Sequence, residues 1–97
     1  MPAYVLVGVD VTDPKAYGEY SREVPTSLEP YGGRFLARGG TFDVLEGDWS
    51  ASRIVVLAFP NVEQAKAWHE SAEYQAILPI RQRHAQTHFM VVVEGVA

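Results

Sequence analysis

The residues best suited to chemistry surround a glycine-rich turn in the middle of the chain. Arg38 ends an apolar segment and precedes Gly39 and Gly40, while Glu46 and Arg53 flank the turn that follows. A guanidinium group in this position could clamp a carboxylate, and the glycines could let a ligand approach the backbone closely. The alternative is structural: an Arg38–Glu46 or Arg53–Glu46 ion pair could fix the turn, as such pairs commonly do without any catalytic role. Arg38, Glu46 and Arg53 are therefore candidate ligand-binding residues.

A second set of candidates is aromatic. Trp68, His69 and Tyr74 fall in the second of two expected helical segments, and Tyr17 and Tyr20 fall in the first. Apolar walls with a few polar tips are typical of small-molecule sites, so we treat Trp68, His69 and Tyr74 as candidates in a pocket between helices and sheet. The alternative is that aromatic residues at helical spacing simply form the core. His69 or His84 could also serve as a general base, because imidazole exchanges protons near neutral pH.

The sequence predicts no metal site and no cofactor. His84 and His88 have the spacing of a metal-binding pair on one helix, but we expect a helix-to-strand transition between them, and no carboxylate cluster lies nearby. No nucleophile elbow, phosphate loop or Ser-His-Asp order is present. We expect Asp10 to lie at a strand end and to contact the loop before the first helix.

Composition limits the class of protein. The 97 residues fit a single domain spanning 1–97, and the absence of Cys excludes disulfides and thiolate chemistry and indicates a reducing, cytoplasmic location. The net charge is −4 and the eight basic residues are dispersed, so a nucleic-acid partner is not expected. The apolar run 54–59 is too short to cross a membrane, and the first residues do not resemble a signal peptide.

The elements that must position these residues follow from hydrophobic spacing. Alternating or continuous apolar residues predict strands at 4–11, 34–38, 53–59 and 87–94, and stripes spaced by three and four predict helices beginning after Asp13 and Asn61. Asp13, Asn61 and Ser71 are expected to cap helices. Pro25 is expected to kink or split the first helix, and Pro79 to disturb the second. A bulge at 39–40 could let residues 42–45 extend the second strand.

This order, β-α-β-β-α-β, predicts a ferredoxin-like α+β fold. Its four-stranded antiparallel sheet would carry both helices on one face, with the first and third strands in the centre. The face opposite the helices is also apolar, since Ile54, Val56 and Ala58 alternate with Val55, Leu57 and Phe59, and the last strand repeats the pattern. We expect a second copy to cover that face in a homodimer. The alternative is a monomer in which the terminal tail or the hairpin folds over the sheet.

Four segments of the chain resemble the domain of unknown function family 1330. They are Tyr31-Gly-Gly-Arg-Phe-Leu-Ala-Arg-Gly-Gly40, Leu45-Glu-Gly-Asp-Trp49, Phe59-Pro-Asn-Val-Glu-Gln-Ala and Ser71-Ala-Glu-Tyr-Gln75. The resemblance covers nearly the whole chain and implies a dimeric α+β barrel. It implies no activity, because the family has none assigned and its superfamily includes monooxygenases, muconolactone-isomerase-like proteins, haem-degrading enzymes and stress-response proteins.

Three functions stay open at this point. The first is a binder of a small aromatic or acidic metabolite, and the second is a cofactor-independent monooxygenase- or isomerase-like enzyme. In such enzymes a pocket Asn, Trp, Arg or His activates the substrate, and Trp68, Arg38 and His69 could supply part of that set. The first strand lacks the Asn that these enzymes and haem-degrading relatives use. The third is a purely structural interaction protein.

Overall fold

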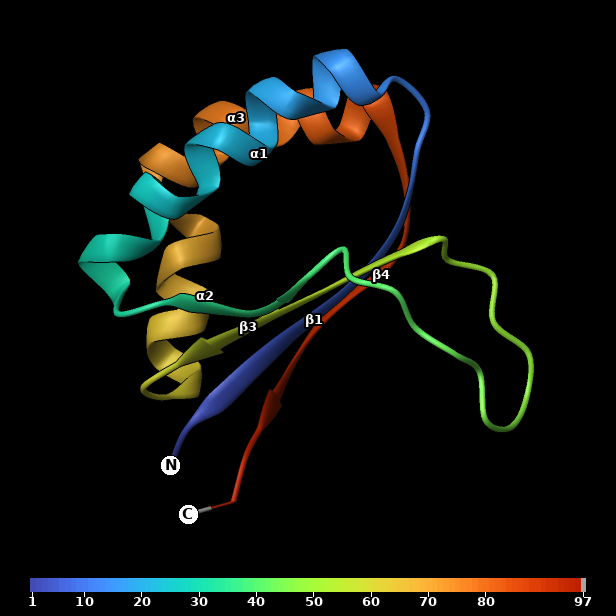
Figure 1. Cartoon of the computed structure of the whole chain (residues 1–97). Helices are drawn as coiled ribbons and strands as arrows, with labels where there is room; N and C mark the ends of the chain where they lie inside the picture. The colour runs from blue at the N-terminus through green and yellow to red at the C-terminus, as the bar shows by residue number, and fades with distance from the viewer. Residues whose placement is uncertain (97) are drawn as a thin grey trace.

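The computed structural model describes residues 1–96 and shows one antiparallel sheet with all helices on one face (Figure 1). The strand order is β2-β3-β1-β4, so the first and third strands are central, as predicted. The second helical segment is two helices that meet at Ser71. The elements are β1 (Ala3–Val11), α1 (Pro14–Leu28), the 3-10 turn η1 (Glu29–Tyr31), β2 (Arg34–Arg38), β3 (Arg53–Phe59), α2 (Val62–Glu70), α3 (Ala72–His84) and β4 (Ala85–Glu94). The ferredoxin-like α+β fold is confirmed.

Each helix begins at the predicted cap. The Asp13 carboxylate accepts from the N–H of Ala16, the Asn61 side chain from that of Gln64, and the Ser71 hydroxyl from that of Tyr74. These side chains satisfy N–H groups that the first turn of a helix leaves without partners. At the far end of the first helical segment, Gly32 adopts a left-handed φ of 70° and stops the chain from continuing as a helix.

Both prolines lie inside continuous helices, so Pro25 does not split the first helix. α1 runs through Pro25, and α3 runs through Pro79. Proline cannot donate to the carbonyl four residues before it, so Pro25 leaves the carbonyl of Ser21 without its helical partner. The Arg38 guanidinium donates to that carbonyl. A side chain from β2 therefore replaces the hydrogen bond that Pro25 cannot make.

The second strand ends at Arg38, and residues 42–45 do not extend it, contrary to expectation. The register shift in this strand lies between Phe35 and Ala37 rather than at the glycines. Gly39 instead ends the strand with a φ of 71°, and a Cβ at this position would collide with the Arg53 guanidinium. The space beside Gly39 is therefore filled by the Arg53 side chain. The chain then forms a loop over residues 39–52 that extends away from the body of the molecule (Figure 1).

The core lies between the helices and the sheet. Successive rows of paired residues lie on alternate faces of the sheet, and the helix-facing rows form the core. Val5 pairs with Leu57 and Val92, and Val7 with Val55 and Met90; the β4 members of these rows, Val92 and Met90, are partly buried. The helices contribute Trp68, Tyr74, Tyr17, Tyr20, Val24, Leu28, Ala65 and Leu78 to the same core.

The outer face of the sheet, which bears no helix, is partly covered by the chain itself. Trp49 packs edge-on against Phe89 with ring centroids 5.4 Å apart, and Ala51 is buried beside Gly8. This contact covers one end of the face. Val91 and Val93 at the other end remain 48% and 47% exposed. The hairpin therefore covers only part of the apolar surface.

A candidate ligand-binding cavity

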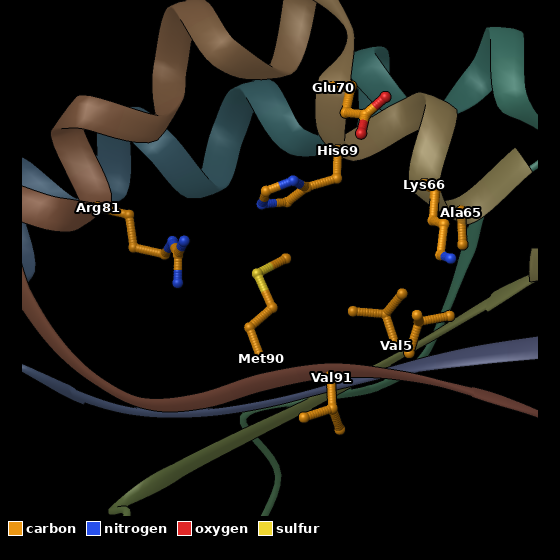
Figure 2. A pocket seen from close by; sticks show the side chains of 9 residues that line it. Val5, Ala65, Lys66, His69, Glu70, Arg81, Met90 and Val91 are labelled. Atoms are coloured by element: carbon orange, nitrogen blue, oxygen red, sulfur yellow. The ribbon is translucent and has the colours of Figure 1, made fainter. Parts of the chain in front are cut away.

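A cavity of about 260 Å³ opens between α2, α3 and the β4 edge of the sheet. Its volume is below that of most drug-sized sites, so it fits a small molecule. Figure 2 shows that Arg81, His69 and Met90, which come from three different elements, point toward one another across this space. The lining residues are Val5, Ala65, Lys66, His69, Glu70, Arg81, Met90, Val91 and Val92.

Arg81 is the most unusual residue of the cavity. It is 5% exposed, and one guanidinium nitrogen donates to the Thr87 hydroxyl at 2.8 Å. Its Nε is buried without a hydrogen-bond partner, and no carboxylate among residues 1–96 lies within 4.0 Å to form an ion pair. Burying an unpaired charge is costly. The cavity therefore presents a cation that lacks an anion.

Arg81 was not among the residues predicted from the sequence, although the spacing contained a signal for it. In α3 the buried residues are Tyr74, Leu78 and Arg81, which recur at intervals of four and three along one face. The spacing therefore places Arg81 on the buried face of the helix. Lys66, Glu70 and Met90 also line the cavity and were not singled out either.

His69 occupies the wall of the cavity formed by α2. Its ring lies 5.4 Å from the ring of Tyr74, and its backbone carbonyl accepts from the Gln75 side chain at 2.6 Å. These contacts fix the end of α2 where it meets α3. Lys66 and Glu70 lie on the same helix and are exposed, so they form the mouth of the cavity. The predicted candidate His69 thus lies beside the unpaired Arg81.

Trp68 and Tyr74 are buried behind the cavity wall and do not line it. Trp68 is 1% exposed, and its indole N–H donates to the Ser27 hydroxyl at 3.0 Å. The hydroxyl groups of Tyr74 and Tyr20 lie 2.7 Å apart. Burial raises the pKa of both tyrosines, and the positive charge of Arg81 offsets part of this increase. These aromatic residues form a neutral, hydrogen-bonded core that supports the cavity.

Arg38 lies away from this cavity. It lines a much smaller one, of about 30 Å³, between α1 and the sheet, and its guanidinium stacks on the Phe35 ring at 4.2 Å. Because it also donates to the Ser21 carbonyl, its hydrogen bonding is directed at the protein. Met90 lines both cavities.

Glu46 and Arg53 do not meet each other or Arg38. Glu46 is exposed in the 39–52 loop, and none of the three forms an ion pair within residues 1–96, so the predicted ion pair is absent. Arg53 borders an open groove along α1 and lies 5.8 Å from the ring centroid of Tyr17. The three charged candidates around the turn thus occupy three separate environments.

Two histidines form pairs outside the cavity. His88 lies on the outer face with its Nε2 2.6 Å from the Asp10 carboxylate, and His84 lies 4.0 Å from Asp13. Asp10 also accepts a hydrogen bond from the backbone N–H of Ser52 at 2.7 Å. It therefore holds the loop before β3, whereas the sequence predicts a contact with the loop before α1. α3 ends at His84 and β4 begins at Ala85, which confirms the transition between His84 and His88. No group of three or more metal-ligating side chains occurs within residues 1–96.

None of the helices in residues 1–96 is long and apolar enough to cross a membrane.

Comparison with known proteins identifies the family and the fold. Residues 2–96 match the family described as "Domain of unknown function (DUF1330)", and the chain belongs to it. No curated protein matches the sequence. Similar solved structures include a protein of unknown function from Rhodopseudomonas palustris, with a TM-score of 0.74 and 17% identity over 99% of this chain and 83% of that one. SnoaB, a cofactor-independent oxygenase from Streptomyces nogalater, has a TM-score of 0.65 and 6% identity over 99% and 94%. A putative antibiotic biosynthesis monooxygenase from Nitrosomonas europaea has a TM-score of 0.61 and 18% identity over the whole of both chains.

Proposed function

We propose that this member of the DUF1330 family binds a small organic carboxylate in the cavity between α2, α3 and β4. The observation that carries this proposal is the buried Arg81 guanidinium, which lines the cavity without an anionic partner. A carboxylate accepts from a guanidinium in charge-assisted, often bidentate hydrogen bonds. The ligand would thereby supply the missing negative charge.

The remaining walls indicate the kind of acid. Val5 and Met90 form an apolar floor, and the His69 ring offers a flat face (Figure 2). Val92 adds a further apolar side chain to the lining. A small carboxylic acid with an aromatic or unsaturated body would place its charge at Arg81 and its body on this floor. The thioether of Met90 favours aromatic neighbours as well.

The test compares acids with their uncharged isosteres. Benzoate, cinnamate and salicylate, each against its amide, would be titrated into the protein by calorimetry and by thermal shift. We expect the acids to bind and the amides to bind at least tenfold more weakly, because a hydrogen bond between charged groups contributes about 1.5–3 kcal/mol. Arg81→Gln should remove this preference. The matched control is Arg83→Gln, which alters an exposed arginine two residues further along the same helix.

Equal binding of acids and amides, or an unchanged preference in Arg81→Gln, would overturn the proposal. Near-UV circular dichroism establishes that each variant is folded. If Arg81→Gln does not fold, Arg81→Lys keeps the charge but loses the planar donor pair, and acid binding should weaken in that variant.

A second candidate function is proton transfer on the bound acid, as in a cofactor-independent monooxygenase- or isomerase-like enzyme. It is favoured by the position of His69, whose ring faces the space beside Arg81 (Figure 2). With the carboxylate held by Arg81, imidazole could remove a proton from an adjacent carbon or hydroxyl group. Phenylpyruvate, whose methylene protons are acidified by the adjacent carbonyl group, incubated with the protein in D₂O separates the two functions. An enzyme would exchange those protons faster than the protein-free solution does, as followed by NMR, whereas a binder would not.

The assembly that we propose is a homodimer formed through the outer face of the sheet. Val91 and Val93 are half exposed there, and the helices occupy the other face. A self-complementary apolar patch is buried most simply by a two-fold axis that sets it against its copy.

A further inference from the structure

The loop between β2 and β3 exposes apolar and acidic side chains to solvent. We call residues 41–49 the arm. Leu45 at its tip is 92% exposed, and Val44, Phe42 and Trp49 are exposed as well. The arm extends beyond the end of the sheet, and only its base is held, by the contact of Trp49 with Phe89 (Figure 1). Exposed apolar residues gathered on one projecting loop are typical of a contact surface.

The arm is also strongly acidic. Asp43, Glu46 and Asp48 lie in it, it contains no Lys or Arg, and none of these carboxylates forms an ion pair within residues 1–96. A surface of this kind fits a partner that is apolar and carries a positive charge.

At the end away from the arm, the outer face of the sheet is apolar and carries a positive charge. The strand register places Arg34, Ala58, Tyr4 and Val93 in one row across it. Arg34 is exposed and has no ion-pair partner among residues 1–96. Arg34 begins β2, whereas the arm follows the other end of that strand and points away from it, so one molecule cannot bring the two together.

A second copy can. A two-fold axis that lies between two facing sheets and runs across their strands reverses the strand direction of the partner. It therefore sets the arm end of one copy over the Arg34 end of the other. A hairpin loop of this length reaches roughly 20 Å, enough to cross the end of a facing sheet about 10 Å away. Because the contact is isologous, it forms twice.

We propose that the arm of each subunit packs on the outer face of its partner, with Glu46 and Asp48 pairing with the partner's Arg34. This inference rests on the proposed homodimer and adds the residues that determine its register. It assigns an intermolecular role to Glu46, whose predicted pairing with Arg38 or Arg53 does not occur.

The experiment is a charge swap read out by sedimentation velocity across a concentration series. Arg34→Glu alone and Glu46→Lys with Asp48→Lys should each raise the dimer dissociation constant at least tenfold, because like charges then face each other. The variant that combines all three substitutions should regain the wild-type dissociation constant. Arg83→Glu, an exposed arginine on the helical layer, is the control and should leave the constant unchanged.

Leu45→Asp gives a second measurement. Since Leu45 is almost fully exposed in the single chain, this substitution has no intramolecular packing to lose. It should weaken the dimer while leaving the circular dichroism spectrum of the fold intact.

The outcomes separate this inference from the homodimer itself. A wild-type dimer whose dissociation constant is insensitive to the arm and Arg34 substitutions would overturn the arm contact and leave the homodimer standing. Weakening without rescue in the combined variant would overturn the pairing of Glu46 and Asp48 with Arg34. A wild-type protein that sediments as a monomer at every concentration would overturn both.

Discussion

At the level of single residues, the position of charge relative to burial separates functional candidates from structural ones. Arg38 and Asp10 direct their hydrogen bonds to the protein itself, to the Ser21 carbonyl and to His88 and Ser52 respectively. Arg81 and Arg53 each have a buried Nε without a hydrogen-bond partner. Arg53 is only half-buried and borders an open groove, whereas Arg81 is 5% exposed and lines the cavity. Since protein interiors rarely leave a charged group unpaired, Arg81 is the residue on which the proposed carboxylate site depends.

Asp10 should give the protein a measurable dependence of stability on pH. The hydrogen bond from His88, followed by those from Ser52, lowers the pKa of Asp10 from 3.8 to about 2. A carboxyl whose pKa is lower in the folded state stabilises the fold above its unfolded pKa, and this contribution is lost as the pH falls toward the folded pKa. We therefore expect Asp10→Asn to melt below the wild type at pH 5 and the gap to shrink as the pH falls to 2, measured by circular dichroism. A gap that stays constant over this range would contradict the assignment.

At the level of elements, the connection between α1 and β2 depends on a compensation. Pro25 frees the Ser21 carbonyl, and Arg38 donates to it. This contact ties the edge strand of the sheet to the helix that covers it, and it explains how α1 continues past a proline.

A double-mutant cycle tests this compensation. Arg38→Ala should lower the free energy of unfolding by about 1 kcal/mol, because it leaves a carbonyl without a partner. The cost should be smaller in a Pro25→Ala background, where the N–H of residue 25 can bond the Ser21 carbonyl within the helix and only the stacking of Arg38 on Phe35 is lost. Urea unfolding measures both values. A Pro79→Ala background is the control, since Pro79 frees the carbonyl of Gln75 on another helix, and the cost of Arg38→Ala should be unchanged there.

At the level of the whole molecule, the sheet has two apolar faces and only one helical layer. The helices bury Val5, Val7 and their neighbours, whereas Val91 and Val93 remain half exposed on the outer face. The hairpin covers the Phe89 end alone, so the monomer alternative explains only part of this surface.

A charge placed on the outer face should therefore act on assembly more than on folding. We expect the wild type to sediment at twice the chain mass of 10.8 kDa at micromolar concentration, and Val91→Asp to sediment as a folded monomer. Ala67→Asp, which adds the same charge to an exposed position of α2, should remain dimeric. Retention of the dimer by Val91→Asp would show that this end of the face is not the interface.

The sequence by itself determined the order of the elements, the helix caps, the central strands and the family. All of these depend on local spacing or local chemistry: a cap requires only a side chain and the N–H three residues later, and a strand face requires only alternation. Asp13, Asn61 and Ser71 were therefore predictable from the sequence alone.

Only the tertiary structure decided how Pro25 is tolerated, that Glu46 stands apart from both arginines, and that Arg81 shares a cavity with His69. Each of these depends on which distant residue lies opposite, and in this chain the partners are brought together by strand pairing and helix packing. Sequence spacing places Arg81 on the same helix face as Tyr74 and Leu78. It does not show what the guanidinium meets, because the absence of a carboxylate within 4.0 Å of it in residues 1–96 depends on every element that packs there.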